Sequence, residues 1–168
     1  MGRDKALLEI DGVPLALRIA GELRKVCESV RLVGDPQRHA MLGLPVMIDN
    51  FPGHGPLAGI EAALGSTDAD WNLIVACDMP ALDTATLESL FAVSGDCSLP
   101  RYAGGQTEPL CAVYHRRCHA TILRALNKGV RKVTDALEAL EITYIPVAST
   151  AAFANLNTPE DVTKYTHG

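Results

Sequence analysis

The sequence predicts an α/β protein of three layers, with helices on both sides of a doubly wound, mostly parallel sheet and one antiparallel hairpin. In the first ninety residues, segments of strand length alternate with segments of helical periodicity, which is typical of this class. Residues 71–77 form an apolar run that ends at Asp78 and Pro80. This pattern is typical of a strand buried on both faces of a parallel sheet. From Cys97 onward, two extended segments joined by glycines predict antiparallel pairing.

The composition indicates one domain and excludes several classes of protein. A chain of 168 residues is long enough for one substantial core, and we expect residues 1–168 to form a single domain. The net charge of −5 argues against a surface that holds nucleic acid by neutralising phosphates. No apolar run is long enough to cross a bilayer, and the charged start lacks the pattern of a secretory signal. We therefore expect a cytoplasmic protein without nucleic-acid or membrane partners.

The five cysteines do not predict disulfides or a zinc site. Their number is odd and their spacing does not repeat, so a disulfide framework is not expected. Two of them lie near two histidines, but the paired Cys-x-x-Cys of structural zinc sites is missing. This group consists of Cys111, His115, Cys118 and His119. We interpret it as an ordinary junction between a strand and a helix.

The first half of the chain is predicted to alternate short strands and helices. Asp-Gly at 11–12 is a turn signal, and Pro14 begins a helix with apolar residues at helical spacing. Strands are expected at 30–33 and 45–48, with a short helix between them, and Asp49 follows the second strand. A strand-end carboxylate therefore occurs twice, at Asp49 and at Asp78.

The second half begins with a glycine- and proline-rich loop at 50–55. Pro56 is placed as the first residue of the next helix, and Asp83 as the N-cap of the helix after the apolar strand. Two helices with one apolar face each and a last strand at 142–147 follow the antiparallel pair. Thr158 and the residues after it have the pattern of a capping box, which predicts a final helix.

Charged and amide side chains gather where strands end. A cation, a metal-binding carboxylate and a helix N-terminus are the parts used in phosphoryl transfer. Each residue also has an ordinary structural interpretation: Lys5 as a surface lysine, and Asp49 and Asp78 as turn or cap residues. Asn155 and Asn157 have one too, as residues that bond to the backbone of their loop.

Five segments in order resemble the molybdenum cofactor guanylyltransferases, within the wider Rossmann-like nucleotidyltransferase superfamily. They are Met-Gly-Arg-Asp-Lys-Ala-Leu-Leu at 1–8, Gly-Pro-Leu-Ala-Gly at 55–59, Cys-Asp-Met-Pro at 77–80, Glu-Pro-Leu at 108–110 and Asn-Leu-Asn-Thr-Pro-Glu at 155–160. The resemblance spans the whole chain. It implies an enzyme that transfers GMP from Mg-GTP to molybdopterin and releases pyrophosphate.

The resemblance also implies roles for individual residues. Lys5 is expected at the nucleotide phosphates, Asp49 at the nucleotide, and Asp78 at Mg²⁺, for which Mn²⁺ can substitute. The other residues implied at the nucleotide or the pterin are Arg3, Gly34, Gly55, Pro56, Asn155 and Asn157. Arg101 and Arg131 are weaker candidates for the pterin side. GTP, molybdopterin, and molybdoenzymes or cofactor chaperones are the implied partners.

The sequence departs from this family at its beginning. Family members start with a buried strand and a glycine-rich loop whose N–H groups reach the phosphates, and here neither precedes Met1. We expect that upstream residues or another segment supply them. Two alternatives remain open: a related transferase that uses CTP or a sugar phosphate, and a domain that binds molybdopterin or a partner without catalysis.

Overall fold

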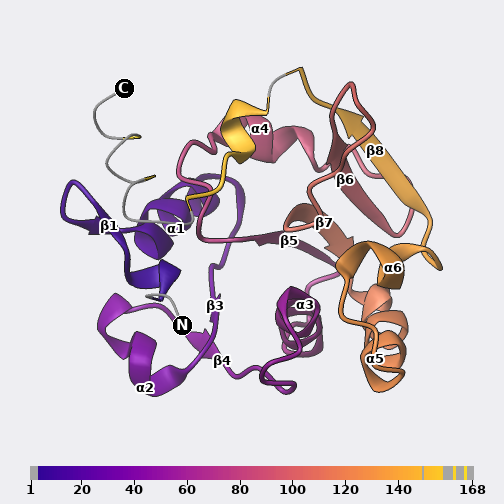
Figure 1. The fold of residues 1–168 in the computed structure, drawn as a ribbon, viewed down its shortest axis with the longest axis horizontal. Coiled ribbons are helices and arrows are strands. Elements are labelled where there is room, and N and C mark those ends of the chain that lie inside the picture. The colour runs from indigo at the N-terminus through magenta and orange to yellow at the C-terminus, as the bar shows by residue number, and fades with distance from the viewer. Residues whose placement is uncertain (1–3, 149, 157–160, 162–164, 166–168) are drawn as a thin grey trace.

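A four-stranded mixed sheet is the centre of the computed structural model, which describes residues 4–148, 150–156, 161 and 165. The strands lie in the order β5, β7, β6, β8 (Figure 1). Their bounds are Trp71–Val75 (β5), Cys111–His115 (β7), Cys97–Arg101 (β6) and Ile142–Pro146 (β8). Strand β7 is antiparallel to β5 and β6, whereas β8 is parallel to β6. The carboxyl ends of β5, β6 and β8 therefore meet at one edge of the sheet.

Two smaller strand pairs precede this sheet. Strand β3 (Leu32–Val33) is parallel to β4 (Val46–Met47), close to the positions expected from the sequence. Strands β1 (Glu9–Ile10) and β2 (Val13–Pro14) form an antiparallel hairpin that we did not predict beyond its turn. Positive φ angles at Asp11 and Gly12 close this hairpin.

The helices predicted between residues 14 and 140 are present, and their ends agree with the local signals. They are α1 (Leu15–Val26), α2 (Pro36–His39), α3 (Pro56–Gly65), α4 (Thr84–Ser89), α5 (His119–Asn127) and α6 (Val133–Leu137), with the 3₁₀ turns η1 (Lys5–Leu7), η2 (Ala40–Leu42), η3 (Arg116–Cys118) and η4 (Ala151–Phe153). Pro56 occupies the first turn of α3, and the Asp83 side chain accepts the Thr86 N–H at 2.8 Å. The predicted helix at Thr158 falls largely outside the described residues.

Helices cover both faces of the sheet, which confirms the three-layer α/β class. Ala112 and Tyr114 of β7 pack into one core with α3, α5 and α6. Cys111 and Val113 point to the opposite face, into a second core with α1, α4 and Phe153. In Figure 1, α4 accordingly lies on one side of the sheet and α3 and α5 lie on the other.

The prediction that residues 71–77 form a strand buried on both faces is wrong. Residues 72–77 are only half-buried and Trp71 is exposed, whereas Cys111 and Val113 on the neighbouring strand are fully buried. The reason is that β5 pairs with β7 along one edge only, and within the described part of the chain no strand pairs with its other edge. Among the described residues, strand β3 is likewise paired only with β4.

No helix in the described part of the chain is long and apolar enough to cross a membrane.

Candidate active site

Asp78 lies just beyond the carboxyl end of β5, in a half-buried position. Its Oδ2 atom is 2.8 Å from Nζ of Lys5, and its main-chain oxygen accepts the N–H of Leu156 at 2.8 Å. Its Oδ1 atom is buried and has no hydrogen-bond partner. A buried carboxylate oxygen without a partner is costly, and a bound cation removes that cost. The carboxylate therefore has the features of a cation ligand.

A second carboxylate, Glu108, lies close to Asp78. Burial raises the pKa of the Glu108 carboxyl, the N–H of Leu110 lowers it, and the negative charge of Asp78 raises it again. The neighbouring Cys77 thiol has a pKa raised to about 11, mainly by burial, so it remains protonated at neutral pH. The negative charge at this edge is therefore carried by carboxylates, and Cys77 serves as a small apolar residue.

The fit of Mg²⁺ can be judged from these donors. In the described part of the chain, no group of three or more His, Cys, Asp or Glu residues is arranged to enclose a metal ion. Mg²⁺ is usually bound through one or two carboxylates, together with water and substrate phosphates. One unpartnered oxygen of Asp78, with Glu108 nearby, fits that mode of binding.

The 49–56 loop forms a separate part of the site, at the start of α3. Asp49 Oδ1 accepts the N–H of Phe51 at 2.8 Å, so this carboxylate does form the turn that its ordinary interpretation predicted. Gly55 has a φ of 75° immediately before α3, which Pro56 begins. Arg131 contacts this loop, because its Nη1 donates to the Gly53 carbonyl at 3.0 Å.

Glu61, which the sequence did not single out, supports this loop. Glu61 lies on the buried face of α3 and is 4% exposed. Its Oε2 accepts from Asn50 at 3.2 Å, and its Oε1 is 2.9 Å from Nε2 of His119. The signal that could have found it is a carboxylate on the apolar face of a predicted helix, since such a group requires buried partners.

The remaining predicted residues fall into three groups. Asn155 is exposed and precedes Leu156, whose N–H binds Asp78, so it lies beside that residue. Gly34 directly follows β3, and a Cβ atom there would lie 2.5 Å from Nδ1 of His39, so packing already requires a glycine. Arg3 and Asn157 lie outside the described residues.

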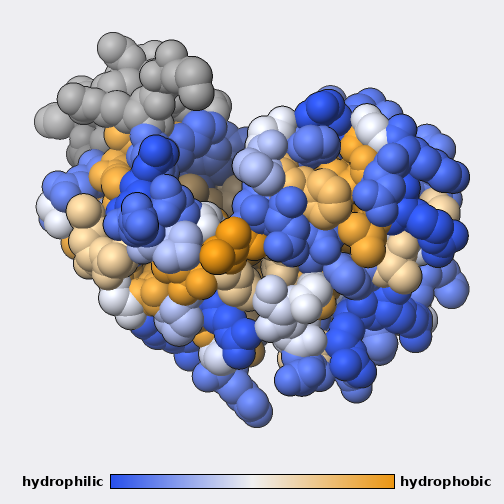
Figure 2. All heavy atoms as spheres, turned by 90° about the horizontal axis from the view of Figure 1, so that it is seen from below, coloured by the Kyte–Doolittle hydropathy of each residue, from blue (hydrophilic) through white to orange (hydrophobic). Residues whose placement is uncertain are grey.

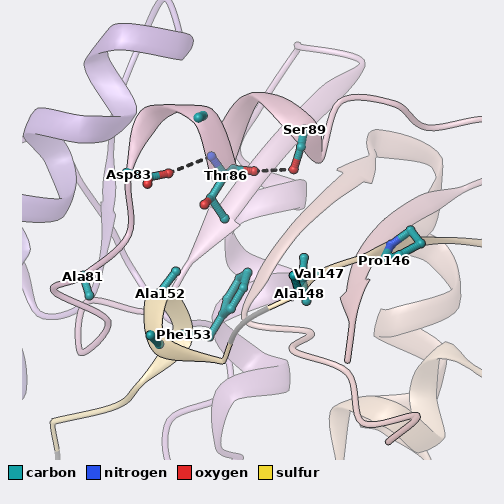
Figure 3. A pocket seen from close by; sticks show the side chains of 11 residues that line it. Ala81, Asp83, Thr86, Ser89, Pro146, Val147, Ala148, Ala152 and Phe153 are labelled. Atoms are coloured by element: carbon teal, nitrogen blue, oxygen red, sulfur yellow. Dashed lines mark hydrogen bonds between the residues drawn. The ribbon is translucent and has the colours of Figure 1, made fainter. Parts of the chain in front are cut away.

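Two adjacent hollows continue the same edge of the sheet beyond Asp78. One, of about 590 Å³, lies between α4 and the chain after β8; Phe153 lies between these walls in Figure 3. The other, of about 610 Å³, is lined by Arg101 and Tyr102. Both share residues 146–148. The guanidinium of Arg101 lies 4.4 Å from the centre of the Tyr144 ring, which fixes it near the second hollow.

Comparison with known proteins assigns this arrangement to a family. The model of the MobA-like NTP transferase domain matches residues 1–141. The chain belongs to this family. A "Probable molybdenum cofactor guanylyltransferase" of Pelotomaculum thermopropionicum is 34% identical over 98% of this chain and 84% of its own length. The "Molybdenum cofactor guanylyltransferase" of Vibrio atlanticus is 29% identical over 98% of this chain and 87% of its own.

Solved structures agree with the MobA-like assignment. The molybdopterin-guanine dinucleotide biosynthesis protein A of Archaeoglobus fulgidus has a TM-score of 0.79 and 27% identity, covering 97% of this chain and 89% of its own. A 2-C-methyl-D-erythritol 4-phosphate cytidylyltransferase of Thermus thermophilus shares the fold, with a TM-score of 0.75 at 14% identity over 96% and 92% of the two chains. This MobA-like chain is thus a nucleotidyltransferase of molybdenum cofactor biosynthesis, from an enzyme class that typically uses a divalent metal.

Proposed function

We propose that this protein transfers GMP from Mg-GTP to molybdopterin and releases pyrophosphate. The observation that carries the proposal is the Lys5–Asp78 pair at the carboxyl edge of the sheet, where one carboxylate oxygen is buried without a partner. Relatives named molybdenum cofactor guanylyltransferases support the same substrates. In this proposal Lys5 and Asp78 are the catalytic residues.

The reaction is an in-line displacement at the α-phosphorus of GTP. An oxygen of the molybdopterin phosphate forms the new P–O bond, the bond from the α-phosphorus to the bridging oxygen of the β-phosphate breaks, and pyrophosphate leaves with its electrons. The Lys5 ammonium neutralises negative charge that develops on the phosphate oxygens. No protein nucleophile is needed, which agrees with the protonated state of the Cys77 thiol.

Asp78 is the proposed ligand of the divalent metal, and its negative charge is one of the causes that raise the pKa of the Glu108 carboxyl. When bound, Mg²⁺ supplies Lewis-acid stabilisation of the phosphate oxygens. The unpartnered Asp78 oxygen supports this assignment because a carboxylate held in that position is ready to accept a cation without rearrangement.

The nucleotide and the acceptor are proposed to lie on opposite sides of Asp78. On the nucleotide side, Asp49, Gly55 and Pro56 belong to the loop that Glu61 and Arg131 support. Gly34 is proposed on the same side, and its N–H donates to the Met47 carbonyl of β4 at 2.9 Å. On the acceptor side, Asn155 and the hollow beside Arg101 face the same sheet edge. Arg3 and Asn157 remain proposed contacts from the sequence resemblance.

We also propose that an extended apolar segment, upstream of Met1 or from another part of the polypeptide, lies between β3 and β5 and completes this single domain. Both strands lack a partner on one edge in the described structure, and α3 packs against both. Apolar side chains also reach the surface in the middle of the face shown in Figure 2, beside a hollow. Unpaired edges with half-buried apolar side chains are unfavourable in a stable domain. A strand and a glycine loop require on the order of a dozen to twenty residues.

The test is a transfer assay with GTP labelled at the α-phosphate, molybdopterin and Mg²⁺. The expected products are molybdopterin-guanine dinucleotide, which carries the label, and unlabelled pyrophosphate. GTP is expected to be preferred to CTP and ATP. The assay is run on the chain that begins at Met1 and on one extended by the upstream coding sequence, and the extended form is expected to bind GTP more tightly. Preference for CTP would make it a cytidylyltransferase, and binding of molybdopterin without turnover in both forms would make it a binding domain. Full activity of a monomer beginning at Met1 would contradict the proposed upstream segment but not the proposed GMP transfer.

A further inference from the structure

A contact between Asp4 and His39 joins the segment that carries Lys5 to a distant part of the chain. The two residues are 35 positions apart, and Nε2 of His39 is 3.0 Å from Oδ2 of Asp4. A carboxylate only accepts hydrogen bonds, so Nε2 carries the hydrogen in this pair. The contact therefore fixes both the ring orientation of His39 and the direction of the Asp4 carboxylate.

The His39 ring is held rigidly at the end of α2. The residue is 7% exposed, and its main-chain N–H donates to the Asp35 carbonyl at 3.0 Å. The ring packs so closely on Gly34 that no Cβ fits there. Nδ1 is buried without a partner, so the ring makes its side-chain hydrogen bond through Nε2. A side chain confined in this way can position the group that it contacts.

Asp4 transmits this restraint to the turn that carries Lys5. Its Oδ1 accepts the N–H of Ala6 at 3.1 Å, and its carbonyl accepts the N–H of Leu7 at 3.1 Å, so Asp4 caps the η1 turn. Ala6 is buried in a small core with Leu42, which follows α2. Lys5 lies between these two anchors, and its Nζ reaches Asp78 across the edge of the sheet.

We propose that Asp4 and His39 are positioning residues that hold the Lys5 ammonium against Asp78. This inference deepens the proposed function and rests on it for the catalytic role of Lys5, whereas the positioning itself is a property of the protein without substrate. Lys5 has a long side chain that is 40% exposed, so a defined position requires that its turn be fixed. Neither Asp4 nor His39 is placed in contact with substrate.

The test measures the chemical accessibility of Lys5, which needs no turnover. Trace acetylation followed by peptide mass spectrometry gives a rate for Lys5, with Lys25 as the internal reference because it lies on α1 in a separate exposed ion pair with Glu22. His39→Leu removes the N–H donor and is expected to raise the acetylation rate of Lys5 at least about threefold, consistent with the loss of one hydrogen bond. His39→Gln keeps an N–H at the ε position and is expected to restore the wild-type rate.

The matched control is Arg38→Ala, from the same helix. Arg38 is 3.5 Å from Oδ2 of Asp4 but is 62% exposed, so its removal is expected to leave the Lys5 rate unchanged. Asp4→Asn serves as the second variant if His39→Leu does not fold, since it keeps the cap oxygen but places an amide against the His39 N–H. A folded His39→Leu or Asp4→Asn protein with the wild-type acetylation rate would overturn the inference, even if its melting temperature had fallen.

Activity provides an independent readout. In the form of the protein that shows activity, His39→Leu is expected to lower kcat roughly tenfold, with a smaller change in the KM for molybdopterin, and His39→Gln is expected to recover most of the loss. If GMP transfer is absent from every form but Lys5 acetylation responds as expected, the proposed function fails and the positioning inference stands. If GMP transfer is present but both the Lys5 acetylation rate and kcat are insensitive to His39→Leu, the positioning inference fails and the proposed function stands.

Discussion

Substitution of Asp78 by asparagine separates the catalytic role of this carboxylate from its contribution to the fold. Asp78→Asn keeps the shape of the side chain and removes its charge, so both the ion pair with Lys5 and the unpartnered anionic oxygen disappear. Because metal binding and charge neutralisation both depend on that charge, we expect a fall of about 10²–10³ in kcat. This corresponds to roughly 2.7–4 kcal/mol of transition-state stabilisation.

The expected effect on stability is much smaller. Lys5 is 40% exposed, so its ammonium becomes hydrated when Asp78 is neutralised, and the pair with this partly exposed group is worth at most about 1 kcal/mol. Removing the charge of Asp78 also removes the cost of burying its unpartnered oxygen, and this effect stabilises the fold. A net change of at most about 1 kcal/mol shifts the melting temperature of a domain this size by roughly 2–4 °C.

The assay combines GMP transfer with thermal melting, using the form of the protein that shows activity. Asp68→Asn is the matched control, since it makes the same chemical change at an exposed position. We expect that control to retain the wild-type rate and melting temperature. Wild-type turnover in folded Asp78→Asn would refute the assignment, whereas an unfolded variant would contradict the argument that this carboxylate adds little stability.

Three further predictions concern other parts of the site. Asp49→Asn is expected to reduce the preference for GTP over ATP by about 1–3 kcal/mol, because a carboxylate can accept from both N1–H and the N2 amine of guanine; an unchanged affinity ratio in calorimetry would count against a base contact. Glu108→Gln is expected to stabilise the fold at pH 7 relative to wild type and to lose this advantage near pH 4. Because the pKa of Glu108 is raised in the folded protein, ionisation of this carboxyl opposes folding at pH values above its pKa in the unfolded chain. Urea unfolding at the two pH values measures the difference, and a destabilised variant at pH 7 would contradict the prediction. Gly34→Ala is expected to cost about 1–3 kcal/mol by overpacking against His39, and a double-mutant cycle with His39→Ala that shows no coupling would disprove that cause.

Local signals in the sequence determined most of the secondary structure. Pro56 and Asp83 marked helix starts because a missing N–H and a capping carboxylate act within one turn. The apolar run that ends at Asp78 predicted the strand and the position of the metal-binding candidate, because this pattern is also local in the chain. The resemblance of ordered segments then indicated the family, which the comparisons confirm.

The sequence did not determine which strands become neighbours. Strand β7 inserts between β5 and β6, so the antiparallel hairpin lies inside the sheet, and β5 is half-buried at an edge. Pairing of this kind depends on backbone edges that are far apart in the chain, and local periodicity carries no information about it.

Tertiary structure alone also decided which polar groups support the site. His39 and Glu61 look like isolated polar residues in the sequence, and their partners Asp4 and Asn50 lie 35 and 11 positions away. Their importance comes from burial, because a polar group removed from water must find a partner inside the fold. The sequence therefore determined the candidate catalytic residues Lys5 and Asp78, whereas only folding decided that their side chains lie 2.8 Å apart and which neighbours hold them there.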